Sequence, residues 1–199
     1  MLDKSVQKIP VLMKKDPGVA PPVFPLPEGF CYEMYQSGYE KDWARIFYSV
    51  ASFESEMDAL LYYQANFLPY GPELSRRCFF VVAPCKERIG TATAWWDYVG
   101  QRRVPLVHWV AVKPTFQGLG IGKALTHELL QLMRTIDGDD TFYLRTQTQS
   151  HKAIRLYEQA GFSIIDDNGI FGYADGRYAD AINLLASIYK DTEERSRIK

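Results

Sequence analysis

Residues 109–125 read WVAVKPTFQGLGIGKAL, an apolar run of β type that leads through a glycine-rich turn into the start of a helix. The first amides of a helix lack carbonyl partners and the helix dipole is positive there, so an anion gains hydrogen bonds and favourable charge. Glycines at 118, 120 and 122 let the backbone approach a bulky anion closely. The stretch therefore predicts a phosphate cradle; a glycine-rich turn without a ligand is the alternative.

The spacing of this turn excludes two familiar phosphate loops. A P-loop places four residues between its glycines and ends in Lys followed by Ser or Thr, whereas three residues separate Gly118 from Gly122 and Ala124 follows Lys123. The dinucleotide-binding fingerprint Gly-x-Gly-x-x-Gly does not match either, because position 123, where it needs its last glycine, is Lys. Residues 117–122 (QGLGIG) instead resemble the acyl-CoA pyrophosphate loop of the GNAT acyltransferase superfamily.

A second segment carries the same resemblance. Residues 150–162 (SHKAIRLYEQAGF) are similar to the second conserved block of that superfamily, Asn-x-x-Ala-Ile-x-Leu-Tyr-Glu-x-x-Gly-Phe. Ser150 stands where Asn is commonest. Because a serine hydroxyl accepts a hydrogen bond from a free first-turn amide, we expect Ser150 to cap the helix, which should end at the C′ residue Gly161.

Composition agrees with a soluble, single-domain enzyme. The chain has 199 residues, of which 47% are hydrophobic, enough to bury one full core. Its net charge of −1 and the lack of a basic stripe argue against a nucleic-acid partner. An odd number of cysteines without a Cys-x-x-Cys pair, namely Cys31, Cys78 and Cys85, suggests reduced thiols in the cytoplasm. We expect no secretory leader and no membrane association, since no apolar run approaches the roughly 18 residues of a membrane span.

The N-terminal 28 residues differ from the rest, because six of the eleven prolines fall before residue 29. Proline lacks a backbone donor and fixes φ, so we expect residues 1–28 to form an extended arm that builds no sheet ladder. Val23, Phe24 and Leu26 favour packing on the chain's own domain or on a second subunit, a homodimer; a polyproline ligand for another protein is the alternative. Residues 29–189 are then the catalytic domain and residues 190–199 a charged tail.

Periodicity predicts the elements of that domain. Apolar or β-branched runs indicate strands at 30–35, 78–83, 89–99, 105–112 and 162–165. A further strand is expected to begin at Thr141. Apolar residues spaced three and four apart indicate three helices. The first has the apolar face Trp43, Ile46, Phe47 and Val50, and the second has Met57, Leu60, Leu61 and Leu68. The third has Ile121, Leu125, Leu129, Leu132 and Ile136. Residues 181–188 are assigned to a last strand, although Ile182, Leu185 and Ile188 also fit a helix.

This order resembles the GNAT fold over about four fifths of the chain. The resemblance implies an α+β, three-layer architecture with helices on both faces of a mixed, mostly antiparallel sheet of six to seven strands. The fourth and fifth strands splay apart after the glycine loop. The pantetheine arm of acetyl-CoA, the implied co-substrate, then pairs with the edge of the fourth strand as an added strand would.

The resemblance also implies which residues bind this co-substrate. Loop amides hold the pyrophosphate and the strand backbone pairs with pantetheine, while Lys123 either adds charge to a phosphate or is simply solvated. The expected cofactor-binding residues are Val110, Ala111, Val112, Gln117, Gly118, Leu119, Gly120, Ile121, Gly122, Lys123, Ser150 and Ala153. An amide on the strand, at Val110, would stabilise the charge that develops on the thioester oxygen.

The chemistry needs a proton donor and a proton acceptor. Tyr157 matches the tyrosine that protonates the departing thiolate in many family members; an aromatic that packs the helix on the sheet is the alternative. Strand alternation puts His108 on the same side as Val110 and Val112, at the position of a proton-route histidine in arylalkylamine N-acetyltransferases. An ordinary pKa near 6.5 suits a base, and a histidine satisfied in the core is the alternative. We expect no metal, since no ligand spacing links the histidines.

The acceptor is predicted less specifically. The resemblance places it among the first two helices, the hairpin and the last strands, and a cationic amine would suit aromatic rings beside a carboxylate. The candidates are Glu54, Trp95, Trp96 and Asp97, although Asp97 also reads as hairpin surface. Together these features predict an N-acetyltransferase that uses acetyl-CoA and a primary amine of a small molecule or peptide in a ternary complex. A GNAT-fold module that binds acyl-CoA without turnover is the alternative.

Overall fold

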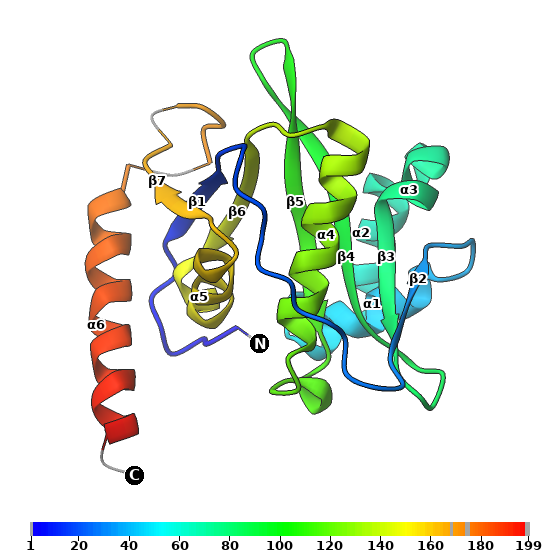
Figure 1. Cartoon of the computed structure of the whole chain (residues 1–199), viewed down its shortest axis with the longest axis horizontal. Helices are drawn as coiled ribbons and strands as arrows, with labels where there is room; N and C mark the ends of the chain where they lie inside the picture. The colour runs from blue at the N-terminus through cyan, green and yellow to red at the C-terminus, as the bar shows by residue number, and fades with distance from the viewer. Residues whose placement is uncertain (1, 168, 174–175, 198–199) are drawn as a thin grey trace.

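Among the residues that the structure describes, seven strands form one sheet: β1 (Pro10–Lys15), β2 (Cys31–Met34), β3 (Cys78–Val82), β4 (Arg88–Val99), β5 (Arg102–Val112), β6 (Phe142–Gln147) and β7 (Ser163–Ile165). A computed structural model describes residues 2–167, 169–173 and 176–197, the last seven as backbone alone. The strand order is β2-β3-β4-β5-β6-β1-β7 (Figure 1). Every neighbouring pair is antiparallel except β5 and β6. The predicted mixed, mostly antiparallel sheet is confirmed.

The described residues form six α-helices, which cover the two faces of this sheet: α1 (Glu40–Ser49), α2 (Glu56–Asn66), α3 (Gly71–Arg77), α4 (Ile121–Asp137), α5 (His151–Gln159) and α6 (Tyr178–Arg197). Side chains of α1, α2 and α3 share a core with Phe80 and Trp95 on one face. Those of α4, α5 and α6 share a second core with Phe79 and Leu144 on the other. The predicted three layers are therefore present (Figure 1).

Strands β5 and β6 diverge, as the resemblance implies. Their parallel pairing covers only Leu106 with Tyr143 and Val107 with Leu144. The rest of β5, from His108 to Val112, continues to pair with β4 but has no partner on its other side among the described strands. This part of β5 therefore presents a free edge toward α5.

The expectation that residues 1–28 build no ladder is wrong for β1. This strand lies inside the sheet, where Met13 is paired with Leu144 of β6 and with Ile164 of β7. Pro10 is the first residue of the strand, a position at which a missing donor is tolerated, and the other prolines follow the strand. Residues 16–29 contain no helix or strand and cross over α4 (Figure 1).

Two further predictions fail, one in the type of element and one in which face of a helix is buried. The last strand assigned to residues 181–188 is absent: α6 spans them and buries Ala181 and Leu185, four residues apart. The charged tail to Arg197 continues this helix, and residues 198–199 lie outside the described residues. In α2 the expected face points to solvent, since Met57 is 60% exposed, while Ala59 and Tyr63 are fully buried.

A bulge interrupts β5 at Trp109. Thr91 pairs with Ala111 but Thr93 pairs with His108, so one extra residue lies on β5 between these two pairs. The extra residue is accommodated at Trp109, whose φ of 50° lies in the left-handed region that bulky residues rarely adopt. Strict alternation of side chains fails from this point onward.

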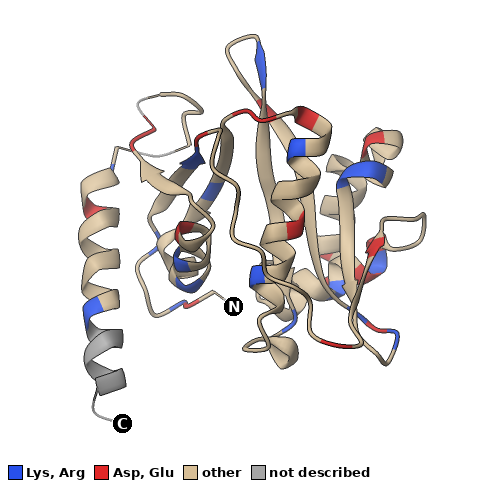
Figure 2. Cartoon of the chain, viewed as in Figure 1, with Lys and Arg blue, Asp and Glu red and all other residues tan. Residues whose placement is uncertain are grey.

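Among the described residues, no helix is both long and apolar enough to cross a membrane. Acidic and basic residues are interspersed over the helices and strands (Figure 2). A partly buried ion pair joins Arg77 to Asp137 at the end of α4 at 2.8 Å, which ties α3 to the opposite face of the sheet.

Candidate active site

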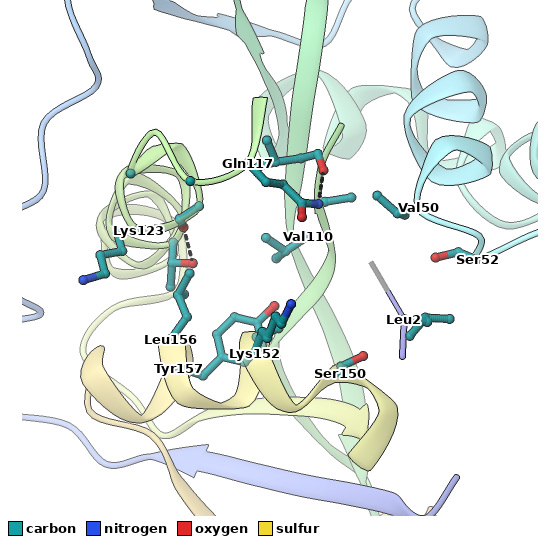
Figure 3. Close-up of a pocket in the computed structure, with 17 residues that line it drawn as sticks. Leu2, Val50, Ser52, Val110, Gln117, Lys123, Ser150, Lys152, Leu156 and Tyr157 are labelled. Carbon is teal, nitrogen blue, oxygen red and sulfur yellow. Dashed lines mark hydrogen bonds between the residues drawn. The ribbon is translucent and has the colours of Figure 1, made fainter. Parts of the chain in front are cut away.

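A cavity of about 550 Å³ opens where β5 and β6 diverge. It lies between the glycine turn that precedes α4 and the first turns of α5 (Figure 3). Eleven of the predicted residues line it: Val110, Ala111, Val112, Gln117, Gly118, Gly120, Gly122, Lys123, Ser150, Ala153 and Tyr157. Two separate sequence blocks therefore meet at one site, as the motifs predicted.

The glycine turn forms an anion cradle. Gly118 and Gly120 have φ of 84° and 81°, and Gly120 is the N-cap of α4. Among the described residues the amides of Gly120, Ile121 and Gly122 donate to no backbone carbonyl, while that of Lys123 donates to Gly120 O at 3.0 Å. Unpaired amides at a helix N-terminus form a site for phosphate oxygens.

Two contacts fix the shape of this turn. The Gln117 side chain donates from Nε2 to Val112 O at 2.9 Å, which ties the turn back to β5 (Figure 3). A Cβ at Gly122 would lie 3.1 Å from Cδ1 of Leu156, so glycine permits the close approach of α4 to α5. Leu119 and Ile121 do not line the cavity: the first is 52% exposed and the second is buried in the core.

The start of α5 differs from the prediction. Ser150 makes no side-chain cap and instead ends a short 3-10 turn, Thr148–Ser150, so the expected hydroxyl cap is wrong. At the other end Gly161 has a φ of 93° and the amide of Phe162 donates to Tyr157 O at 3.0 Å. This is the predicted C′ glycine.

Tyr157 points its hydroxyl into the cavity, toward Val110 (Figure 3). The side chain is 7% exposed, and burial raises the pKa of its phenol well above the ordinary value. The group therefore stays protonated over the whole physiological range. A phenol held neutral beside an open strand edge is a suitable proton donor.

His108 does not lie where alternation placed it. Because of the bulge at Trp109, its ring packs against Phe67 and Trp109, 5.7 Å from each ring centre, on the face opposite Val110 and Val112. It is not among the residues that line the cavity. Burial and the nearby Arg145 lower the pKa of His108 to about 3, so the expected value near 6.5 is also wrong.

The predicted acceptor residues lie outside this cavity. Asp97 forms an ion pair with Arg145 at 2.7 Å, and the Arg103 guanidinium covers the Trp96 ring at 4.1 Å. Trp95 and Trp96 stack on each other with ring centres 4.2 Å apart. Glu54 is exposed in the loop between α1 and α2. The structure does not bring these four side chains together as one cation site.

Six lining residues were missed by the sequence analysis: Leu2, Val50, Ser52, Thr126, Lys152 and Leu156. Helical spacing from Ala153 and Gly122 could have found Leu156 and Thr126. Val50 and Ser52 follow α1, and Leu2 comes from the N-terminal segment. These three reach the site through tertiary contacts that no local pattern signals.

Comparisons with known proteins agree with this geometry. The chain is 29% identical over 153 residues to the mycothiol acetyltransferase of Salinispora tropica, covering 70% of this chain and 46% of that protein. It is 39% identical over 56 residues to the N-alpha-acetyltransferase RimI of Mycobacterium tuberculosis, covering 28% and 33%. The chain thus spans less than half the length of the curated relatives it matches.

A solved structure shares the fold. The GCN5-related N-acetyltransferase from Sphaerobacter thermophilus aligns with a TM-score of 0.60 at 20% identity, over 79% of this chain and 49% of that one. The sequence profile of the acetyltransferase (GNAT) family, whose members use acetyl-CoA as co-substrate, matches residues 31–162. That match includes both the glycine turn and the Tyr157 block. The chain belongs to the GNAT acetyltransferase family.

Proposed function

We propose that this chain is an N-acetyltransferase that transfers an acetyl group from acetyl-CoA to a primary amine. One observation carries the proposal: a single cavity joins the free amides of the glycine turn to the hydroxyl of Tyr157. An anion site at one end of the groove, with a proton donor farther along it, suits an extended thioester.

The co-substrate would bind along the free edge of β5. The amides between Gly118 and Gly122 hold the pyrophosphate, and the backbone of Val110 and Val112 pairs with the pantetheine arm as an added strand does. Lys123 lines the cavity, and its ammonium, which lies over the Phe24 ring at 5.3 Å, adds charge beside the phosphates once its side chain turns toward them. Ser150 and Ala153 of the opposite wall contact the arm from the α5 side.

Transfer then proceeds by direct attack. The neutral amine nitrogen adds to the thioester carbon while the amide of Val110 donates to the carbonyl oxygen, which carries the developing negative charge. The carbon–sulfur bond breaks next, and Tyr157 supplies a proton to the departing thiolate. The products are an acetylated amine and CoA.

The amine must also lose a proton. The predicted acceptor, His108, packs on the opposite face of the sheet and does not line the cavity, so we propose that water carries this proton away instead. A pKa of about 3 also makes the imidazole of His108 a weak base toward an ammonium group, whose ordinary pKa is near 10.

The acceptor we propose is an amine of a small molecule or a peptide. One relative, RimI of Mycobacterium tuberculosis, is an N-alpha-acetyltransferase, which supports the amine class. Interspersed charges and the net charge of −1 do not favour a polyanion such as nucleic acid (Figure 2). We further propose a cytoplasmic enzyme, active as a monomer or a homodimer.

A thiol assay tests this function. Purified chain is mixed with acetyl-CoA and a panel of amines, amino acids and short peptides, and free CoA is measured over time. CoA release that depends on one acceptor class, with a mass increase of one acetyl group on the acceptor, supports the proposal. Tight binding of acetyl-CoA with no release for any amine would favour a binding module instead.

A further inference from the structure

The cavity has two unlike ends. One end is the glycine turn, and Figure 3 shows Leu2 beside Ser52 on the side opposite Lys123. Tyr157 and Val110 lie between them (Figure 3). With the pyrophosphate on the turn, the acyl group is the part of the ligand that comes nearest to Leu2.

The chain holds Leu2 at this place through the turn before α5. The amide of Asp3 donates to Gln149 O at 2.9 Å, and an Asp3 carboxylate oxygen lies 3.4 Å from Nε2 of His151. The Gln149 side chain donates to Val6 O at 3.1 Å. The N-terminal segment is therefore attached to residues that border the cavity.

A second set of contacts continues this attachment to the sheet. The amide of Ile9 donates to the Thr148 hydroxyl at 2.9 Å, and the amide of Thr148 donates to Ile9 O at 3.0 Å. Ile9 is 2% exposed, and Thr148 is fully buried. Since β1 begins at the next residue, the segment from Leu2 to Ile9 is fixed at both ends.

We infer that Leu2 limits the length of the acyl group that the site accepts. This inference rests on the proposed orientation of acyl-CoA in the cavity. Leu2 and Val50 present aliphatic carbon at the end of the groove, so an acyl chain longer than acetyl meets the Leu2 side chain. Removing that side chain leaves apolar space for additional methylenes.

The test measures binding of CoA, acetyl-CoA and butyryl-CoA by calorimetry, with any purification tag at the C-terminal end. In Leu2→Ala, each acyl methylene that becomes buried against apolar side chains should improve binding affinity by about fourfold. The affinity for butyryl-CoA should therefore rise by roughly tenfold or more over that of the unmodified chain. CoA and acetyl-CoA should bind within about twofold of the unmodified chain. Val23→Ala is the matched control, because Val23 lies on the same N-terminal segment and is 75% exposed.

A second variant tests the opposite direction. Leu2→Trp should weaken acetyl-CoA by about tenfold while CoA, which lacks the acyl group, is nearly unaffected. If the ratio of butyryl-CoA to acetyl-CoA affinity is the same in Leu2→Ala as in the unmodified chain, the role of Leu2 is wrong. If CoA itself does not bind, both this inference and the proposed orientation are overturned.

Discussion

Burial has opposite consequences for Tyr157 and His108, the two side chains assigned to proton transfer. An apolar environment disfavours the charged form of each group, which is the phenolate for tyrosine and the imidazolium for histidine. The pKa of Tyr157 therefore rises and that of His108 falls. Both side chains are neutral near pH 7, so Tyr157 keeps a proton to donate, whereas the low pKa of His108 makes its lone pair a weak proton acceptor.

Replacing Tyr157 with Phe should separate chemistry from binding. We expect kcat to fall by about 10²-fold or more, because a positioned proton donor contributes that much to a departing group. Acetyl-CoA affinity and thermal stability should stay unchanged, since the phenol has no hydrogen-bond partner among the described residues. Steady-state kinetics and calorimetry measure the two quantities.

A matched tyrosine supplies the control for this substitution. Tyr189 donates to His151 O at 3.0 Å and does not line the cavity. Tyr189→Phe should lose about 1 kcal/mol of stability with the hydrogen bond and keep its kcat. Equal kcat values in the two variants would show that Tyr157 is not the acid.

His108 should make stability depend on pH in a definite direction. Its folded pKa of about 3 lies below the unfolded value near 6.5, so between these values the unfolded chain binds the extra proton. Its contribution to stability is complete above pH 6.5 and decreases as the pH falls, by at most about 1.4 kcal/mol per unit.

The contribution of His108 is isolated by difference. Urea unfolding of the unmodified chain and of His108→Asn, compared at pH 7.5 and pH 4.5, should show the gap between the two free energies shifting in favour of the variant at the lower pH. A gap that does not change with pH would contradict the low pKa. The pH profile of kcat for the unmodified enzyme should likewise show no titration step from His108 near pH 6.5.

At the scale of elements, local patterns predicted the cofactor half of the site well. The glycine turn, the helix from Ile121 and the Tyr157 block are continuous in sequence, and their function depends mainly on backbone amides and on helix starts. Such features are recognisable from glycine positions and helical spacing alone. The cavity accordingly contains most of the residues predicted for it.

The elements that were misjudged depend on long-range contacts. The bulge at Trp109 arises because its ring packs among Trp43, Phe47, Phe53 and Tyr62, which the sequence does not bring together. Residues 181–188 fit both a strand and a helix, and the contact of α6 with the second core decides between them. β1 was not predicted because the prolines that follow it favour an extended arm over a strand. Leu2 and Ser52 enter the site for the same tertiary reasons.

The position of β1 can be tested by a single substitution. Met13 is fully buried between β6 and β7, so Met13→Ala should cost roughly 2–5 kcal/mol of unfolding free energy. Met57→Ala is the control, because Met57 is 60% exposed on α2 and its truncation should cost within about 0.5 kcal/mol. Similar losses in the two variants, measured by chemical denaturation, would mean that β1 does not lie in the sheet.

At the scale of the whole molecule, the gap that holds the site also divides the sheet. Within the described part of the chain, two residue pairs, at Leu106 and Val107, join the strands β2 to β5 to the strands β6, β1 and β7. Helices α4 and α5 complete the connection across one face. A ligand that pairs with the free edge of β5 and contacts α5 therefore links the two halves.

Acetyl-CoA should consequently stabilise the entire chain and protect the strand edge. At a concentration 100 times its Kd, a ligand that binds only the folded state adds about 2.7 kcal/mol, or roughly 5–11 °C in Tm for a chain of this size. Hydrogen exchange should slow at Val110 and Val112, whereas the exposed β4–β5 turn at Gly100 serves as the unprotected reference.

Pantetheine, which lacks the pyrophosphate, is the control. It should raise the Tm much less at equal concentration, since it leaves the amides of the glycine turn unpaired. A full shift with pantetheine would mean that the glycine turn is not the anion site, and an unchanged Tm with saturating acetyl-CoA would contradict binding in the gap.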